Sequence, residues 1–443
     1  MSHHRRNELD RARLDTMLAD MSRRGFLRTS GVAAGAAAGV SFAFSPTVEA
    51  QTPGSINTLV YVFLRGAMDG LSFVVPIGDG DDAVRYRQRR NSTRMSITDS
   101  DSARRPLTLN GGQPFGLHPA ASGLRTLFNE NRMAIVHGAG HLEPSTYNRS
   151  HFDAQEQVEL GTPGLQSFTH GWLAKHLMTT TRLPGAIFNA IAAASTPPQS
   201  LQGWTESVTL NNTSGFHPDP SHTYSNTHLR GLRALYAGSG DLDHAAQAAV
   251  DAVDVIGAIN FGSYVPGGGV TYPNTGVSNN LKLIATLIRQ NIGLNVATLD
   301  VGGWDTHNNQ GVFSGGGFFT LVQQLSEALT AFYRDMAGSG FGNRITVVVQ
   351  TEFGRQVTEN SSAGTDHGLA CPMLVLGGKV RGGWYGEFPG LSVTPGDAVR
   401  PTVDFRQVLA TAIDKLVGNT NPQGVFHSTA SPFTYSPMGF WNP

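Results

Sequence analysis

Two short segments, residues 294–300 and 345–350, place the tightest limit on the fold of this chain. Both are rich in aliphatic and β-branched residues, as is typical of strands that are buried on both faces of a parallel sheet. An amphipathic helical pattern over residues 318–337 separates them. Strands that alternate with helices predict an α/β fold with a central, mostly parallel sheet flanked by helices.

The same alternation extends along most of the chain after residue 50. Residues 162–280 are less regular and contain connections rich in Gly, Pro, Ser, Thr and Asn. The simplest organisation is one domain over residues 51–443, in which a cap or insertion around 162–280 shapes access to a site. The remaining strand-like runs cover residues 56–64, 133–137 and 373–376, and helical patterns cover residues 118–129, 147–161, 172–178, 242–259, 279–291 and 403–417.

Two Asp/His pairs come after the two buried strands. Asp305 and His307 follow the first strand, Asp366 and His367 follow the second, and each pair lies in a glycine-containing turn. Carboxylate oxygens and imidazole nitrogens both bind zinc or manganese, and glycine permits the tight turn that lets neighbouring side chains converge. Either pair alone is more often a turn with satisfied hydrogen bonds.

The positions of the pairs predict one shared pocket. Ligands of parallel sheets lie beyond the carboxyl ends of the strands, and neighbouring strands are about 4.8 Å apart. The carboxylates of Asp305 and Asp366 are therefore expected within about 12 Å of each other. Asp69 follows the strand at 56–64 and is expected at the same edge, where three carboxylates repel one another unless a cation is bound.

Other polar residues near these turns allow two interpretations each. Glu352 and Arg355 could bind a metal or an oxyanion, because a guanidinium fork matches phosphate and sulfate geometry. They could equally form a buried ion pair that braces the turn, and Arg65 with Asp69 has the same ambiguity. A further cluster contains three histidines, and structural or supporting roles are expected for at least two of them: His137, His141 and His151.

The N-terminal segment predicts export. Arg23 and Arg24 form a twin-arginine pattern, which precedes a weakly apolar run over residues 31–44 and small residues suited to cleavage before Gln51. The run is too short to span a bilayer core of roughly 30 Å. Residues 1–50 are therefore expected to be a cleaved Tat signal, read by the Tat translocase, and the product is expected in the periplasm or secreted without a permanent membrane anchor.

Charge and cysteine content exclude several classes of protein. The formal net charge is -1, which gives no reason to expect a nucleic-acid partner. Cys371 is the only cysteine, so no internal disulfide forms and the core must provide stability. One cysteine and the lack of a cofactor fingerprint also argue against haem, iron–sulfur or flavin redox proteins.

Five motifs together are more specific than any of these features. They occupy residues 63–71, 150–155, 303–307, 351–355 and 364–368. In this order they closely resemble an exported bacterial family, the domain-of-unknown-function family numbered 1501, over nearly all of the chain after residue 50. That family is similar to the alkaline phosphatase and sulfatase superfamily, so the resemblance implies an alkaline-phosphatase-like domain.

The resemblance also implies roles for individual residues. Ser150 matches the hydroxyl nucleophile at a helix N-terminus, with Ser145 and Thr146 as alternatives, whereas Arg355 and Glu352 complete the catalytic set. Asp305 and His307 are closer together than the first Asp and His of the superfamily phosphatases. A third late histidine is absent except for His427, and the sulfatase nucleophile motif is missing. The implied metal ligands are Asp69, Asp305, His307, Asp366 and His367.

These residues imply two functions of different classes. The first is an exported hydrolase of phosphate or sulfate esters that uses a divalent metal such as Zn, Mn or Ca and acts on a small-molecule or cell-envelope substrate. In it Arg355 stabilises the oxyanion. The alternative is a non-catalytic cell-envelope binding or assembly protein that keeps the fold.

Overall fold

The computed structural model describes nine ranges of the 443-residue chain: 57–92, 95–98, 100–143, 146, 149–165, 169–180, 188–210, 225–391 and 398–442. Their residues fall into two compact units. One contains the described residues up to 210 together with 261–442, and the other contains residues 225–260. The predicted export signal and Ser145 lie outside the described residues.

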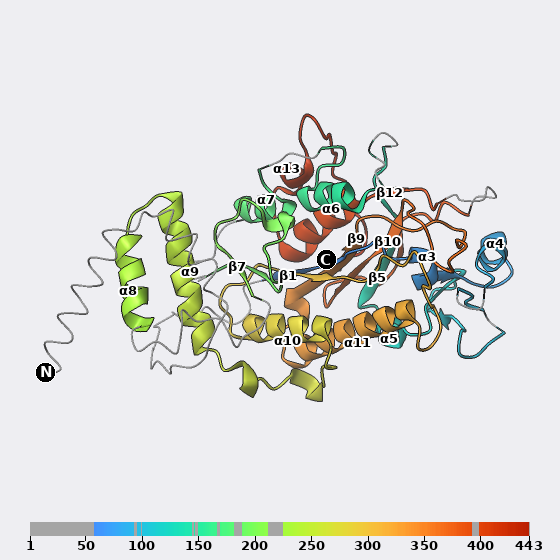
Figure 1. Ribbon diagram of the computed structural model, residues 1–443, viewed down its shortest axis with the longest axis horizontal. Helices are drawn as coiled ribbons and strands as arrows, with labels where there is room; N and C mark the ends of the chain where they lie inside the picture. Colours follow the sequence, from blue (N-terminus) through green and yellow to red (C-terminus); the bar gives the residue numbers. More distant parts are fainter. Residues whose placement is uncertain are drawn as a thin grey trace, which may run out of the picture. The chain divides into compact units, whose positions relative to one another are not determined.

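A central sheet of nine strands dominates the described part of the larger unit (Figure 1). Its order is β11-β5-β10-β9-β1-β8-β6-β7, and β12 also pairs with β5. All pairings are parallel except those of β10, which runs antiparallel to both neighbours. The prediction of a mostly parallel sheet is confirmed. The strands are β1 (Thr58–Leu64), β5 (Met133–Gly140), β6 (Ala190–Ala192), β7 (Ser207–Thr209), β8 (Val296–Val301), β9 (Ile345–Thr351), β10 (Cys371–Gly377), β11 (Gly383–Tyr385) and β12 (Val403–Asp404).

The central strand β1 sets the edge at which the functional loops meet. All seven of its residues are buried, in keeping with its aliphatic and aromatic sequence. Leu64 at its end is in register with Val301 of β8 and with Thr351 of β9. The loops after β1, β8 and β9 therefore leave the sheet at one edge, and β8 and β9 are separated by β1 rather than adjacent.

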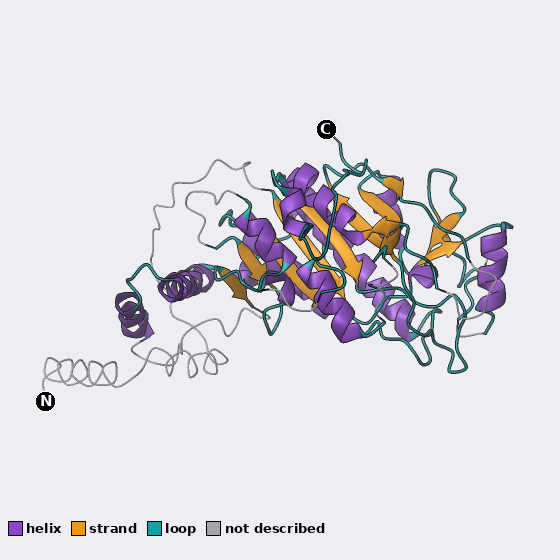
Figure 2. Ribbon diagram, turned by 90° about the horizontal axis from the view of Figure 1, so that it is seen from above, coloured by secondary structure: helices purple, strands orange, loops and turns teal. Residues whose placement is uncertain are grey.

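Helices cover both faces of the sheet (Figures 1 and 2). On one face lie α5 (Ser122–Asn129), α10 (Gly276–Arg289) and α11 (Gly317–Gly338). On the other lie α6 (His151–Leu160), α7 (Trp172–Met178), α12 (Phe405–Thr411), the π-helix η6 (Ala412–Val417) and α13 (Pro422–Phe426). This second layer closes a large core, in which Tyr61 of β1 packs edge-on against Trp172 at a ring separation of 5.0 Å.

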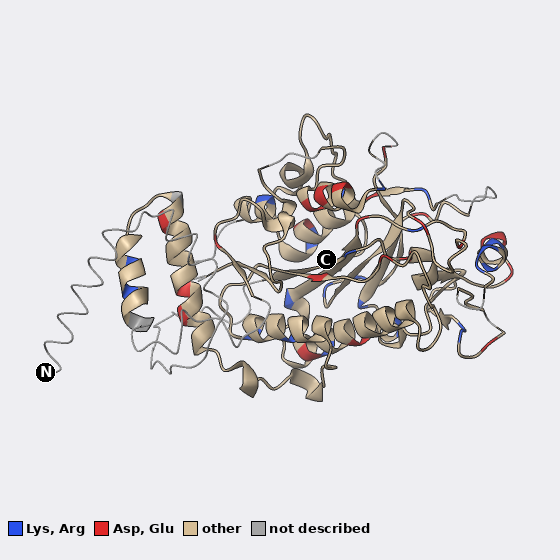
Figure 3. Ribbon diagram, in the orientation of Figure 1, with Lys and Arg blue, Asp and Glu red and all other residues tan. Residues whose placement is uncertain are grey.

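Smaller elements complete the larger unit. A three-stranded sheet contains β2 (Val74–Pro76), β4 (Phe115–Leu117) and β3 (Leu107–Thr108), and short helices are α3 (Gly70–Phe73), α4 (Asp81–Arg89), η2 (Gln199–Leu201), η3 (Phe261–Ser263), η4 (Gly267–Gly269) and η5 (Gly342–Arg344). Charged residues of both signs are interspersed (Figure 3); α4, for example, has acidic residues in its first turn and basic residues in its last. This arrangement complements the helix dipole.

The region expected to be an insertion divides between the two units. β6, β7 and α7 belong to the larger unit, where β6 and β7 extend the central sheet. The smaller unit contains α8 (Ser225–Leu235) and α9 (Asp241–Ala258), which are joined by ion pairs of 2.6 Å from Arg233 to Asp251 and Asp254. That this region caps a site stays a prediction. Within the described ranges, no helix is both long and apolar enough to cross a membrane.

Candidate metal centre

Four side chains meet at the edge where the parallel strands end. Asp305 and His307 follow β8, and His151 begins α6 after β5. His367 precedes β10, and because β10 is antiparallel its first residues lie at this same edge, where Cys371 pairs with Ala139 of β5. The reversed strand therefore brings a preceding loop to the place where the other strands deliver following loops.

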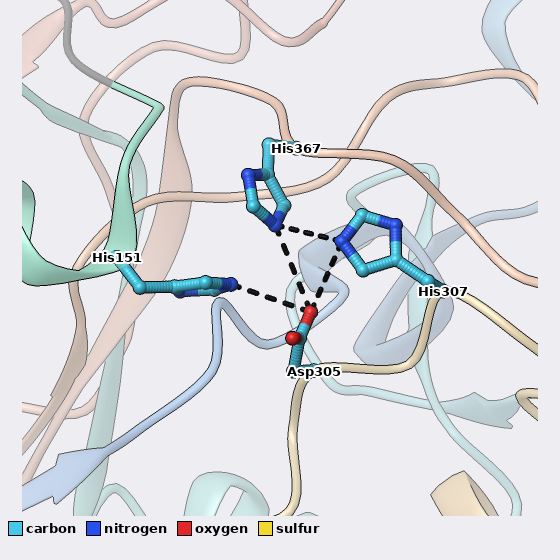
Figure 4. A group of neighbouring side chains, drawn as sticks. All are labelled: His151, Asp305, His307 and His367. Atoms are coloured by element: carbon cyan, nitrogen blue, oxygen red, sulfur yellow. Dashed lines mark hydrogen bonds and ion pairs between the residues drawn. The ribbon is translucent and has the colours of Figure 1, made fainter.

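The potential ligand atoms of these four residues all lie within 4.8 Å of one another (Figure 4). Asp305 Oδ1 is 3.3 Å from His151 Nε2, 3.2 Å from His307 Nε2 and 3.7 Å from His367 Nε2. The Nε2 atoms of His307 and His367 are 2.8 Å apart. Three imidazoles and one carboxylate thus point at a common space.

Hydrogen bonds on the outer nitrogens determine which imidazole atoms face this space. His307 Nδ1 is 3.0 Å from Asp366 Oδ1, and His367 Nδ1 is 2.6 Å from the carbonyl oxygen of Arg149. A carbonyl or an ionised carboxylate only accepts, so each Nδ1 must carry the proton and donate. The neutral rings then present Nε2 lone pairs inward.

These inward lone pairs fit a cation. At 2.8 Å, the lone pairs of His307 and His367 repel each other unless a positive charge lies between them. His151 Nε2 is enclosed and faces Asp305 Oδ1 at 3.3 Å. Three imidazole nitrogens and a carboxylate oxygen form a donor set typical of zinc, and carboxylates or carbonyls on the outer nitrogens are the usual support of metal-binding histidines.

Glu352 supports His151 rather than facing the common space. Its side chain is fully buried, and its Oε1 accepts hydrogen bonds from His151 Nδ1 at 2.7 Å, Gln155 Nε2 at 2.9 Å and Gly66 N at 2.9 Å. Burial alone would raise the pKa of Glu352, but hydrogen bonds from His151, Gln155 and Thr351 lower it overall. The bond to Glu352 in turn raises the pKa of His151.

Asp366 supports His307 in the way that Glu352 supports His151, by accepting a hydrogen bond from the outer ring nitrogen. Its carboxylate is half exposed, and its Oδ1 accepts from His307 Nδ1 and from Asn360 Nδ2 at 3.0 Å each. These hydrogen bonds lower the pKa of Asp366. The structure therefore brings the two Asp/His pairs together but turns Asp366 toward the outer side of His307, and His151 occupies the place expected for it.

Arg355 braces the loops around the cluster. Its guanidinium is completely buried and donates to the carbonyl oxygens of Ala67 at 2.7 Å and Thr365 at 2.8 Å, and to Asp305 Oδ1 at 2.7 Å. Burial raises the pKa of Asp305, but the bond from Arg355 lowers it overall. Arg355 braces the turn as one interpretation expected, but its ion-pair partner is Asp305 rather than Glu352, and its buried guanidinium is committed to these protein groups.

Asp69 is not part of the cluster, which corrects the expectation that it would join the pocket. Its carboxylate is fully buried, caps α3 at Ser72 N, pairs with Arg90 and accepts from Gln310 Nε2 at 2.6 Å. Burial raises the pKa of Asp69, but Arg90 lowers it overall. Arg65 pairs elsewhere, and its partners are Asp300, Gln155 and Glu159. The sequence offered no signal that Arg90 would neutralise Asp69.

The expected nucleophile lies next to one of the clustered histidines. Ser150 is the N-cap residue of α6, in an extended conformation, and directly precedes His151. The alternative Thr146 donates to the carbonyl oxygen of Glu143 at 2.7 Å and so stabilises a turn.

The loops after β1 and β8 approach each other closely at Gly66. Its φ is +116°, and a Cβ there would lie 2.4 Å from Asp305 N.

The remaining histidines have structural environments. His137 stacks on Trp384 at a ring separation of 5.0 Å, and His141 Nδ1 is 3.2 Å from the carbonyl oxygen of Thr146. His427 contacts the backbone of Phe433. Burial lowers the pKa of four histidines to about 4: His118, His137, His141 and His176.

Comparisons with known proteins give one family. The family model described as "Protein of unknown function (DUF1501)" matches residues 137–435. Among curated proteins, nothing matches this chain significantly.

Several solved structures share parts of the topology at low similarity. The C-terminal periplasmic domain of EcEptC from Escherichia coli, in complex with Zn, is 8% identical with a TM-score of 0.39, and the match covers 86% of this chain and 89% of that chain. The PsFucS1 sulfatase from Pseudoalteromonas sp. is 10% identical with a TM-score of 0.34, covering 86% and 73%. The lipoteichoic acid synthase LtaP from Listeria monocytogenes is 11% identical with a TM-score of 0.32, covering 88% and 79%.

Proposed function

This chain belongs to the DUF1501 family, and from that membership and the clustered side chains we propose that it is an exported, metal-dependent hydrolase of phosphate or sulfate esters. The observation that carries the proposal is the convergence of three imidazole Nε2 atoms and Asp305 Oδ1 within 4.8 Å. His151, Asp305, His307 and His367 would hold the cation. Asp69 and Asp366, which the motifs suggested as ligands, are left out of this set.

The donor set favours some cations over others. Zinc and manganese accept mixed nitrogen and oxygen ligands, whereas calcium takes six to eight oxygen ligands. Three of the four converging atoms are nitrogens. Zinc or manganese is therefore the proposed cation, and calcium fits the site less well.

The surrounding charges define what the site needs in order to bind an anionic ester. Asp305, Glu352 and Asp366 all have lowered pKa values and are ionised, while Arg355 contributes one positive charge. A divalent cation would cancel this net charge of two negatives, polarise the ester oxygen and lower the pKa of an attacking hydroxyl or water. With the cation bound, the net charge of these groups is zero, so a further positive group is needed to attract an anionic substrate.

Two residues beside the cluster are proposed to act on the substrate. Arg149 is exposed, and its carbonyl oxygen accepts from His367, so its backbone lies beside the proposed cation site. We propose that its guanidinium binds the phosphate or sulfate group. Ser150, between Arg149 and His151, is the proposed nucleophile: its oxygen would attack the phosphorus or sulfur atom, its proton would pass to the departing alkoxide, and the alcohol of the ester would leave. Water would then attack the phosphorus or sulfur of the resulting serine ester, releasing phosphate or sulfate and restoring the hydroxyl.

One observation favours a second candidate function. Asp69 matches the first Asp of the phosphatase and sulfatase pattern, but here it pairs with Arg90 rather than facing the cation site. A non-catalytic protein that keeps the fold for binding or assembly at the cell envelope, and does not require a metal, would show this departure.

Metal content and turnover separate the candidates. Purified protein should contain close to one zinc or manganese ion and hydrolyse 4-nitrophenyl phosphate or sulfate, and chelation should abolish turnover. His307→Ala should lose both properties, whereas the matched control His427→Ala should keep them. Bound metal without turnover on either ester would count against the hydrolase, and no bound metal would exclude it. The envelope protein, which requires no metal, would be supported by either outcome.

A further inference from the structure

Gln310 joins the two loops that carry most of the cluster. Its side chain is buried, and its Oε1 accepts hydrogen bonds from Thr306 Oγ1 at 2.9 Å and from Thr365 Oγ1 at 2.8 Å. Thr306 lies between Asp305 and His307, and Thr365 is two residues before His367. A single amide oxygen is thus bonded to both loops next to their ligand residues.

The other end of the Gln310 amide is bonded to Asp69. Gln310 Nε2 donates to Asp69 Oδ2 at 2.6 Å, and the fully buried Arg90 pairs with the same oxygen. Arg90 also donates to the carbonyl oxygens of Gln356 at 2.7 Å and Val357 at 2.8 Å. This network therefore extends from the loop after β1 to the loop after β9.

The chemistry of the network permits one orientation of Gln310. An ionised carboxylate can only accept, so the NH₂ group must face Asp69 and the carbonyl oxygen must face the two threonine hydroxyls. Turning the amide over would place oxygen against the carboxylate inside a buried region, where unpaired polar groups are costly. The orientation of Gln310 is thus fixed by Asp69 and in turn sets the positions of both threonines.

The two loops are packed too closely for alternative arrangements. A Cβ on Gly364 would lie 2.1 Å from the carbonyl oxygen of His307. Backbone hydrogen bonds from Gln310 N to Ala363 O, at 2.8 Å, and from Thr365 N to Thr306 O, at 3.2 Å, hold the loops side by side. The Gln310 side chain adds hydrogen bonds to a threonine of each loop across this contact.

We propose that Asp69 and Gln310 are positioning residues of the metal centre: Asp69 orients Gln310, and Gln310 sets the separation of the loops that carry Asp305, His307 and His367. This inference rests on the proposed function. It assigns Asp69 a role as an anchor rather than a ligand. Loss of a hydrogen-bond partner of a metal ligand typically weakens affinity about 10–100-fold. Gln310 bonds to the threonines beside the ligands and not to the ligands themselves, so a loss at the lower end, about tenfold, is expected when Gln310 is removed.

The test measures the affinity of the full chain for zinc alone, by competition with a chromophoric chelator. Gln310→Leu should weaken zinc binding about tenfold. Thr306→Val and Thr365→Val should each weaken it less, and the matched Thr306→Ser and Thr365→Ser variants, which keep the hydroxyl, should bind as wild type. The threonine series keeps the inference testable if Gln310→Leu does not fold.

A control distinguishes positioning from general stability. Asp335 is a buried carboxylate of α11 that accepts from Tyr272 Oη at 2.8 Å and from Gly267 N at 2.6 Å. It lies about 25 Å along the helix from the first turn, where Phe318 N donates to the carbonyl oxygen of Gln310. Asp335→Asn should lower the melting temperature and leave zinc affinity unchanged. If wild type binds zinc and Gln310→Leu and both valine variants bind it with the same affinity, the inference is overturned but the proposed function is not. Failure of wild type to bind zinc would overturn the proposed function as well.

Discussion

The Asp366→Asn substitution separates a metal ligand from a residue that orients one. In the structure, Asp366 Oδ1 accepts from His307 Nδ1 at 3.0 Å on the side of the ring away from the converging atoms. An asparagine oxygen can still accept this hydrogen bond, so His307 should keep its proton on Nδ1 and its lone pair on Nε2. What is lost is the negative charge that strengthens the bond.

The size of the effect follows from the exposure of Asp366. Loss of an outer partner weakens metal affinity about 10–100-fold, and the lower end is expected because the Asp366 side chain is 49% exposed and solvent already screens its charge. A tenfold loss is about 1.4 kcal/mol. With wild type at a free zinc concentration of about 100 Kd, zinc stabilises the fold by ~2.7 kcal/mol, which should fall to ~1.4 kcal/mol in the variant.

Two assays measure this difference. Chelator competition gives the zinc affinity directly, and urea unfolding with zinc or with EDTA gives the stabilisation. Asp305→Asn, which changes a converging oxygen, serves as the comparison and should lose far more affinity. If Asp366→Asn abolishes zinc binding as completely as Asp305→Asn does, Asp366 is a ligand and the arrangement derived above is wrong.

Four further predictions address other features. The four buried histidines have pKa values near 4 and bind fewer protons than they would in the unfolded chain. As the pH falls from about 6.5 to 4, the free energy of unfolding, measured by urea titration in EDTA, should therefore decrease by up to ~5 kcal/mol per pH unit. Constant stability from pH 7 to 5 would contradict this. Replacing Arg23 and Arg24 together by lysine should retain the protein in the cytoplasm on fractionation, and normal export would show that the segment is no Tat signal. Gly364→Ala should lower both melting temperature and zinc affinity because its Cβ meets the His307 carbonyl oxygen, whereas the control Gly231→Ala, in α8 with open space, should be neutral or stabilising by up to ~1 kcal/mol. Arg149→Gln should raise KM for an aryl phosphate more than tenfold with intact zinc content, and an unchanged KM would remove Arg149 from substrate binding.

The sequence was a good guide to the layered fold because its strands and helices are long and strongly patterned. The runs at 56–64, 294–300 and 345–350 became β1, β8 and β9 with shifts of one or two residues. It gave no indication of β6 and β7, since three residues are too few for a periodic pattern. The reversal of β10 was equally hidden, because a short apolar run does not encode its direction.

The site was predicted less completely for a geometric reason. Sequence motifs identify residues that can bind a cation, but ligation depends on which ring nitrogen or carboxylate faces inward. Asp366, expected as a ligand, instead accepts from the outer nitrogen of His307, and His151, one of three histidines for which at least two supporting roles were expected, faces inward because Glu352 accepts from its outer nitrogen. Asp69 left the set because Arg90, twenty-one positions along the chain, neutralises it inside the core.

The wide spacing of the clustered residues has a consequence for folding. His151 reaches the cluster from a helix that follows β5, whereas His367 reaches it from the connection between β9 and β10, more than two hundred residues later. A cation held by both would bind only after these distant segments have docked, so partly folded chains would lack the site. Cation uptake would then act late, slowing unfolding rather than starting folding, and the bound protein would resist every opening that separates α6 from β10.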